Sequence, residues 1–330
     1  MAEFGRFERN IKSLINWPSD GAVVHKNSVG QGLRAVLNAL PTPIRVVASV
    51  SEFDSVDFIL REYEKRSLVQ TTWVEPSSSE SGMPKFATDD YLDAIAPGID
   101  LVIISLVIFT TGQIVPGVDE IIAKAHAAGA RVFLDTYHST GVYPWSHPEA
   151  DFAAGGCYKY LRGGPGACWL AIHPRNFGLH TLDTGWFAKQ DTFGFHREAE
   201  RAQGGRGWWE STPAPLPLFQ ARSGIEFTLE IGVDDIRRHT LLRLAALHEG
   251  LAPLGGFVPE DESEWGGFAL LPSDRSDEIV ALLKENKINV DARQGNVRFG
   301  PDILTTFEEI DQTCQVLSSK LGRGHVSPLR

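Results

Sequence analysis

Cysteine is scarce in this chain of 330 residues, which contains only Cys157, Cys168 and Cys314. No two of them form a CxxC pair, so neither a disulfide framework nor a zinc site is expected, and a reducing compartment fits. Long hydrophobic runs are lacking too, since the longest, residues 101–109, is too short to span a bilayer. The opening MAEFGRFERN carries charges where a signal peptide has an apolar segment. We therefore expect a cytoplasmic protein.

Positive charge is also in short supply, with 31 Lys and Arg against 42 Asp and Glu and a formal net charge of −11. Such a balance disfavours nucleic acid and anionic membranes as partners. The remaining composition, 42% hydrophobic and 22% charged, is ordinary for a globular protein. Single cores stop growing at roughly 250–300 residues, so the length favours one large and one smaller domain.

From about residue 44 the chain alternates between apolar runs and helical spacing. β-Branched and apolar runs predict strands, and amphipathic spacing predicts helices. This order predicts an α/β fold with a mostly parallel sheet and helices on both faces. The predicted strands include 45–50, 101–109 and 131–138, and the predicted helices include 55–66 and 118–130.

The pattern changes after Pro174. Residues 176–215 are rich in glycine, aromatic and charged residues, and the prolines at their end exclude a regular element there. A smaller unit of helices and strands follows from about residue 252. We predict a short N-terminal arm over 1–27, a large domain over 28–240 and a small C-terminal αβ domain over 241–330. The prolines are Pro213, Pro215 and Pro217.

Charged residues stand at the ends of two predicted strands. Asp135 ends RVFLD, His138 follows on the exit loop, and Lys159 lies between tyrosines in GGCYKYLRGGPG. Ligands of open parallel sheets bind at the carboxyl ends of strands. A lysine amine can form a Schiff base with an aldehyde cofactor, and a carboxylate can pair with a protonated pyridine nitrogen. Together these residues indicate a site for a pyridoxal-type cofactor.

Each residue alone has a plainer explanation. Asp135 could cap a turn, and Lys159 could extend its amine to solvent. Asp135 and His138 could be half of a metal site, although no further ligands are evident nearby. The Gly-Gly-Pro-Gly sequence could be a turn and nothing more. The joint pattern is far more specific than any of its parts.

The segments AHAAGARVFLDTYHSTGVYPW and ADFAAGGCYKYLRGGPGACWLAIHP resemble kynureninase, within the class V branch of fold type I pyridoxal-phosphate enzymes. TTGQIVPG upstream and LDTGWF downstream add to the resemblance, which covers residues 28–220 well and the C-terminal domain loosely. It implies a fold type I, transferase-like α/β architecture with pyridoxal 5′-phosphate in the large domain. It also implies an amino-acid substrate and a homodimer with shared active sites.

The resemblance assigns roles to the residues around the lysine. Lys159 would form the Schiff base and carry the proton, and Asp135 would pair with the pyridinium nitrogen. His138 would lie beside the aspartate and the cofactor. Tyr158 would reach the phosphate and assist proton transfer.

Other residues would bind the phosphate and the ring. Backbone amides of Val29 and Gly30 and the hydroxyl of Ser28 lie at a predicted helix start, where anions are favoured. Phe53 would stack on the ring. A plain helix start and a core phenylalanine are the alternatives for these residues. Trp186, Ser211 and Thr212 would reach the phosphate of the neighbouring subunit.

The substrate would be held mainly by an arginine. Arg298, inside the apolar strand NVRFGP, would bind the α-carboxylate through a bidentate pair, with Arg293 as the reserve. Thr212 would also contact the substrate. It stands where the family has an asparagine, and its shorter side chain lacks the amide's donor and acceptor.

Two further departures from the family concern the N-terminus and one acidic residue. The part before residue 28 is short for the family. Val56 stands where the family has a carboxylate near the cofactor ring, with Asp54 and Asp57 close by. The pyridoxal chemistry is therefore better supported than kynurenine as the substrate.

The leading functional hypothesis is hydrolytic Cβ–Cγ cleavage of an amino acid with a γ-carbonyl. The first alternative is a class V aminotransferase or a β-eliminating lyase of specialised metabolism. A cysteine desulfurase is disfavoured, because no cysteine is expected on a mobile loop. A non-catalytic binding protein on the same fold and a metal hydrolase using Asp135 and His138 are the hypotheses from other classes.

Overall fold

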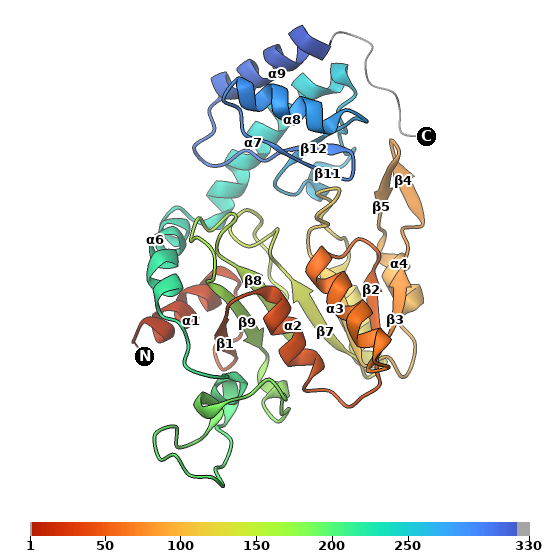
Figure 1. Cartoon of the computed structure of the whole chain (residues 1–330). Coiled ribbons are helices and arrows are strands. Elements are labelled where there is room, and N and C mark those ends of the chain that lie inside the picture. The colour runs from red at the N-terminus through yellow and green to blue at the C-terminus, as the bar shows by residue number, and fades with distance from the viewer. Residues whose placement is uncertain (1, 322–330) are drawn as a thin grey trace.

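The structure, a computed structural model, describes residues 2–321 and contains a large and a small sheet (Figure 1). The large sheet has the strand order β1-β9-β8-β7-β6-β2-β3. All neighbouring strands are parallel except β9, which runs antiparallel to β8 and β1. The predicted mostly parallel sheet is confirmed. Its strands are β1 (Ala22–Lys26), β2 (Ile44–Ser49), β3 (Val69–Val74), β6 (Leu101–Ser105), β7 (Arg131–Asp135), β8 (Phe152–Gly156) and β9 (Cys168–Ile172).

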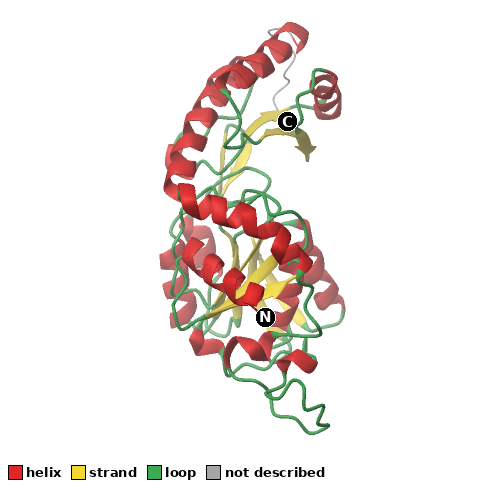
Figure 2. Cartoon of the chain, turned by 90° about the vertical axis from the view of Figure 1, so that its left-hand side faces the viewer, coloured by secondary structure: helices red, strands yellow, loops and turns green. Residues whose placement is uncertain are grey.

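Helices cover both faces of this sheet, as the alternating pattern predicts (Figure 2). Helices α2 and α3 pack on one face, against Ile103 and Phe133. Helices α1, α4, α5 and α6 pack on the other, against Val102 and Leu134. Successive strand residues point to opposite faces, which is why the central strands are apolar throughout. The helices are α1 (Ala2–Leu14), α2 (Val29–Leu37), α3 (Asp54–Lys65), α4 (Thr88–Ala94), α5 (Val118–Ala127) and α6 (Leu216–Ile231).

Three local features differ from the sequence-based expectation. The first 27 residues, expected as an arm, contribute helix α1 to one core and the edge strand β1 to the large sheet. The apolar run 101–109 stops being a strand at Ser105, and Val107 forms only an isolated bridge with Ile114. Pro217 lies in the first turn of α6, where a missing backbone N–H costs nothing.

The C-terminal part forms the smaller antiparallel sheet, in the order β10-β12-β11, with a core of its own. Helix α7 runs through residue 240, so the expected domain boundary falls inside one continuous helix. Among the described helices none is both long and apolar enough for a membrane span. The elements are α7 (Val233–Leu251), β10 (Ala269–Pro272), α8 (Ser276–Glu285), β11 (Asp291–Arg293), β12 (Asn296–Phe299) and α9 (Phe307–Leu321).

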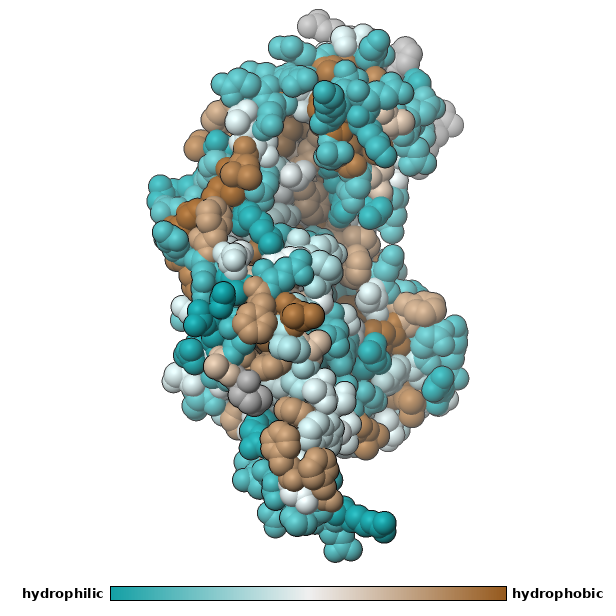
Figure 3. All heavy atoms as spheres, turned by 60° about the vertical axis from the view of Figure 1, so that its left-hand side comes forward, coloured by the Kyte–Doolittle hydropathy of each residue, from teal (hydrophilic) through white to brown (hydrophobic). Residues whose placement is uncertain are grey.

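Residues 176–215 include a projection from the body of the large sheet (Figure 1). Only short 3-10 turns form there, among them Trp186–Ala188 and Gly204–Trp208. Phe193 and Phe195 are 71% and 73% exposed. Hydrophobic side chains gather on the projection in Figure 3. Exposed aromatic residues on a segment without a core are typical of a contact surface.

A short hairpin follows the edge strand β3 of the large sheet. It consists of β4 (Ser78–Glu80) and β5 (Met83–Lys85), which pair antiparallel. Lys85 pairs with Glu80 on the same hairpin and with Glu264 of the C-terminal part, at 3.1 and 3.0 Å. The hairpin therefore ties the two parts of the chain together.

Candidate active site

The carboxyl ends of β1, β2, β6, β7 and β8 meet at one edge of the large sheet. They surround a cavity of about 270 Å³. All eight residues predicted at the strand ends and the first helix turn line this cavity. The lining comprises Asn27, Ser28, Val29, Gly30, Phe53, Ser55, Val56, Ser105, Asp135, Tyr137, His138, Tyr158, Lys159, Pro165, Gly166 and Cys168.

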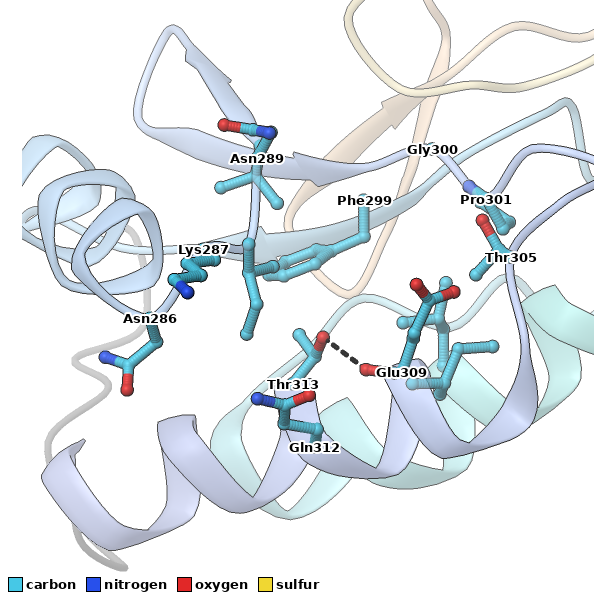
Figure 4. A pocket seen from close by; sticks show the side chains of 14 residues that line it. Asn286, Lys287, Asn289, Phe299, Gly300, Pro301, Thr305, Glu309, Gln312 and Thr313 are labelled. Carbon is cyan, nitrogen blue, oxygen red and sulfur yellow. Dashed lines mark hydrogen bonds between the residues drawn. The ribbon is translucent and has the colours of Figure 1, made fainter.

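Another cavity, of about 360 Å³, lies in the C-terminal part between α7, α9 and residues 286–290 (Figure 4). Its charged lining residues are Lys287 and Glu309, on opposite sides of the opening (Figure 4). Thr313 Oγ1 donates a hydrogen bond to the Glu309 carbonyl at 2.7 Å. Chemistry therefore singles out the cavity at the sheet edge, where several titratable groups converge.

Lys159 follows the end of β8 and points its amine among aromatic rings. Its Nζ lies 5.0 Å from the ring centre of Tyr137 and 5.5 Å from that of Phe53. Burial lowers the pKa of Lys159 to about 8, although Asp135 acts in the opposite direction. At pH 7.5 roughly a quarter of the amine is then unprotonated, against about one part in a thousand for an ordinary lysine. The amine is thus available as a nucleophile.

His138 contacts this amine directly, with Nε2 2.5 Å from Lys159 Nζ. Burial, and then the charges of Lys159 and Arg298, lower the pKa of His138 well below its usual range. The imidazole is therefore neutral, and its Nε2 shares a hydrogen bond with the amine. Its ring also stacks near Phe109, at 6.5 Å between centroids.

Asp135 is the last residue of β7 and is only 6% exposed. Its Oδ1 accepts a hydrogen bond from the Tyr137 N–H at 2.9 Å. Burial raises the pKa of Asp135 to about 6, while that hydrogen bond and Lys159 favour the carboxylate. A buried acceptor with a raised proton affinity suits a protonated ring nitrogen.

A second buried carboxyl group, Glu52, lies close to Asp135. Its two oxygens accept hydrogen bonds from Ser49 Oγ at 3.0 Å and Ser105 Oγ at 2.6 Å. Ser105 is the register partner of Asp135 across the β6–β7 pair. Burial, reinforced by the charge of Asp135, raises the pKa of Glu52 to about 7, against the effect of its hydrogen bonds.

Glu52 was not predicted from the sequence, where the residues considered near the ring were Val56, Asp54 and Asp57. Val56 is buried in the core, while Asp54 is exposed and Asp57 pairs with Arg61 at 2.9 Å. An acidic residue just beyond a buried strand was the available signal. Its proximity to Asp135 depends on the register of three strands, which local sequence does not reveal.

The predicted phosphate site lies at the start of α2. Ser28 caps the helix, and its Oγ accepts a hydrogen bond from Gln31 N at 3.1 Å. The first amides of a helix have no partner within the helix, so those of Val29 and Gly30 can bind an anion. Both residues line the cavity with Lys159.

A partly buried network, also missed from the sequence, supports this helix start. Lys26 Nζ donates to Glu210 Oε1 at 2.6 Å and to the Trp208 carbonyl at 3.0 Å. Gln31 Nε2 donates to both carboxylate oxygens of Glu210, each at 3.0 Å. The segment before Ser211 is thereby fixed to the predicted phosphate loop.

The remaining predicted residues do not line the cavity. Arg298 lies on β12, with Nη1 donating to the Phe109 carbonyl at 3.2 Å, and its charge lowers the pKa of Lys159. The Trp186 ring packs on Phe195 in the projection, at 5.9 Å between centroids. The expected contribution of Trp186, Ser211 and Thr212 to a neighbouring subunit stays a prediction. Arg293 is exposed on β11.

Comparison with known proteins places this site in a family. The family model of aminotransferase class V matches residues 1–312. The chain belongs to this family. Among curated class V relatives, kynureninase of Geobacillus thermodenitrificans (strain NG80-2) is 28% identical over 69% of the chain. Kynureninase of Bacillus anthracis is 30% identical over 69% of the chain.

These matches cover the relatives unequally. The chain spans little more than half the length, 56%, of each of the two kynureninases. An uncharacterised aminotransferase of Bacillus subtilis (strain 168) is 26% identical, and the match covers 86% of the chain and 81% of that relative.

Solved structures share this fold. A cysteine desulfurase from Thermococcus onnurineus NA1 superposes with a TM-score of 0.84 at 17% identity, over 96% of this chain and 83% of that one. The cystine C-S lyase C-DES, in a mutant form with glycine covalently linked to its pyridoxal-phosphate cofactor, gives 0.85 at 19% identity, over 96% and 85%. The predicted fold type I architecture is confirmed.

Pyridoxal 5′-phosphate, the cofactor predicted from the sequence, follows from membership of class V. The residues at the sheet edge fit it, since they offer a reactive amine, a buried carboxylate and a helix start for a phosphate. Lys159 would hold the aldehyde carbon, Asp135 the ring nitrogen and residues 28–30 the phosphate.

Proposed function

We propose that this class V enzyme is a kynureninase-like hydrolase that cleaves the Cβ–Cγ bond of an amino acid with a γ-carbonyl. The carrying observation is the convergence of Lys159, Asp135 and His138 in one cavity. The kynureninase relatives support the reaction, although the chain spans only 56% of their length.

Each residue of the cavity has a separate role in the proposed reaction. The bound cofactor supplies an electron sink for a carbanion at the substrate's α-carbon. Asp135 keeps a proton on the ring nitrogen, and Ser28 with the amides of Val29 and Gly30 binds the phosphate. The Lys159 amine, when free, would take the α-proton. His138 is hydrogen-bonded to that amine and orients it.

Substrate recognition and assembly complete the proposal. Arg298 binds the α-carboxylate from the C-terminal part. Two copies of the chain form a homodimer in the cytoplasm, in which Trp186, Ser211 and Thr212 reach the partner's site. The aromatic projection in Figure 3 supports such a contact.

An aminotransferase is the second candidate, favoured by the length of one match. The Bacillus subtilis aminotransferase relative aligns over 86% of the chain, compared with 69% for the kynureninases. Both reactions begin with removal of the α-proton by a lysine, so the residues described so far serve either one.

Cysteine desulfurization, the activity named for one fold neighbour, has less support from the thiols of this chain. Cys168 lines the cavity but is held on β9, and burial raises its pKa to about 11. Burial raises the pKa of Cys157 further, and Cys314 lies on α9 of the C-terminal part. A desulfurase needs a reactive thiolate near the substrate, and these thiols are poor nucleophiles.

The test is a visible absorbance spectrum of the purified protein with kynurenine and with 3-hydroxykynurenine. A band from the lysine-bound cofactor, followed by release of anthranilate and alanine, supports the hydrolase. A keto acid together with the amine form of the cofactor supports the aminotransferase. A stable band that no amino acid changes contradicts both and supports a binding protein.

A further inference from the structure

The predicted carboxylate-binding arginine already has an acidic partner. Asp291 on β11 stands directly opposite Arg298 on β12 in the antiparallel register. Opposite residues place their side chains on the same face of a sheet. Arg298 Nε donates to Asp291 Oδ1 at 2.8 Å, and Nη2 donates to Oδ2 at 2.6 Å. The Asp291 carboxylate thus binds one edge of the guanidinium through two hydrogen bonds.

This bidentate pair leaves some N–H donors of the Arg298 guanidinium free for another ligand. A guanidinium has five N–H donors. Asp291 takes two of them and the Phe109 carbonyl takes a third, from Nη1. Within residues 2–321, the other two N–H groups, one on each terminal nitrogen, have no hydrogen-bond partner. Such a pair of donors is what a second carboxylate binds.

The arginine lies near the lysine cavity, although it is not among the lining residues. Its guanidinium carbon lies 5.3 Å from the Phe268 ring centre, and that ring is 6.4 Å from the His138 ring. The charges of both Arg298 and Asp291 act on the pKa of Lys159, in opposite directions. Arg293 shares the same carboxylate, at 3.3 Å.

The pair persists at neutral pH. The hydrogen bonds and charge of Arg298 hold the pKa of Asp291 below its usual value, against partial burial. An ionised Asp291 fixes the plane of the guanidinium through two charge-assisted bonds. Without Asp291 this partly buried arginine would sample more rotamers, so the bond pair orders it before a substrate binds.

We propose that Asp291 is a positioning residue that orients Arg298 for the α-carboxylate and thereby selects amino acids over amines. The inference rests on the proposed function, in which Arg298 binds that carboxylate. In the opposite case Asp291 would compete with the substrate for the guanidinium. The two cases predict effects of opposite sign.

The test uses Asp291→Asn in the cofactor-loaded protein. Asparagine keeps the shape but has one acceptor in place of two, so the bidentate grip is lost. Binding of L-alanine and of ethylamine is followed by the shift of the visible cofactor band. We expect L-alanine to bind on the order of tenfold more weakly, and ethylamine to be unaffected. Unchanged or tighter L-alanine binding overturns the proposal.

Controls separate this outcome from general damage. Glu278→Gln removes the exposed ion pair with Arg275 in the same part of the chain. It should change the binding of neither L-alanine nor ethylamine. Arg298→Lys should weaken the binding of L-alanine at least as much as Asp291→Asn does. If the wild type shows the band but prefers L-alanine no more than ethylamine, the positioning role falls. If the band is missing, the proposed function itself fails.

A second measurement needs no cofactor. Asp291 raises the pKa of Lys159, so in the cofactor-free protein Asp291→Asn should lower it. The pH dependence of acetylation of the Lys159 amine reports that value. If Asp291 served only the structure of β11 and lay away from the site, the pKa of Lys159 would stay the same, and that result would count against the proposal.

Discussion

The candidate site has two sides of different character. The edge of the large sheet contributes two buried carboxyl groups, Asp135 and Glu52, and the partly buried Lys159, all with shifted pKa values. The small sheet contributes charged groups that are partly exposed and already paired, Arg298 and Asp291. Burial changes reactivity, whereas exposed charge mainly provides attraction. We therefore expect the first side to govern the chemistry and the second to govern substrate choice.

The largest effect is expected for Lys159→Ala on the sheet side. Loss of the amine removes both the attachment point and the proton carrier, so the visible band should disappear. Activity on the true substrate should fall by about 10²- to 10⁴-fold or more. Steady-state rates and the absorbance spectrum check this. Lys65→Ala, an exposed position on α3, is the control, and equal loss there would contradict a special role for Lys159.

Asp135→Asn should be the next most severe substitution. An amide is neutral and cannot stabilise a protonated ring nitrogen, so kcat should fall by about 10²-fold or more while the cofactor still binds. The band position, its intensity and kcat are the measurements. Near-normal kcat with an intact band would show that the sheet side does not govern the chemistry.

Arg298→Gln probes the other side and should give a different kinetic pattern. Loss of a bidentate charged contact should raise KM for an amino acid by about 10- to 100-fold, with a smaller change in kcat. The cofactor band should stay as in the wild type. Loss of the cofactor band, or a fall in kcat alone, would contradict the claim that Arg298 governs substrate choice and not the chemistry.

The sequence could predict the sheet side better for a physical reason. Asp135, His138 and Lys159 lie at or just beyond the ends of neighbouring parallel strands, whose carboxyl ends must meet at one edge, so spacing along the chain was enough. Residues 28–30 were placed beside them by the resemblance to the family, together with the predicted helix start. The alternating pattern likewise predicted the fold, because strands buried on both faces and amphipathic helices have distinct periods.

The missed features depend on contacts between distant segments. Lys26 and Glu210 are 184 residues apart, and nothing local marks them as partners. The Asp291–Arg298 pair needs the register of a hairpin in the small sheet. Strand ends, too, are set by packing, as the early end of β6 at Ser105 shows. The sequence pattern reveals the periods of helices and strands, whereas pairs between distant residues are set only in the folded chain.

Glu52 gives the smallest expected effect on activity and a sharp effect on stability. Its pKa is raised from 4.5 to about 7 in the folded chain, so the folded state binds more protons than the unfolded state between these values. Stability relative to an uncharged side chain is therefore highest at or below pH 4.5 and is lost as the pH rises to about 7. A shift of this size corresponds to about 3 kcal/mol.

Glu52→Gln keeps the shape without the charge and should escape this loss. Urea unfolding of both proteins at pH 5 and pH 8 should show the variant gaining up to about 3 kcal/mol relative to the wild type at the higher pH. The bond from Ser105 Oγ survives on the amide oxygen, but Ser49 must rearrange, which lowers the gain. A difference independent of pH would mean that Glu52 is ionised throughout. The buried sheet side would then tolerate charge as the exposed side does.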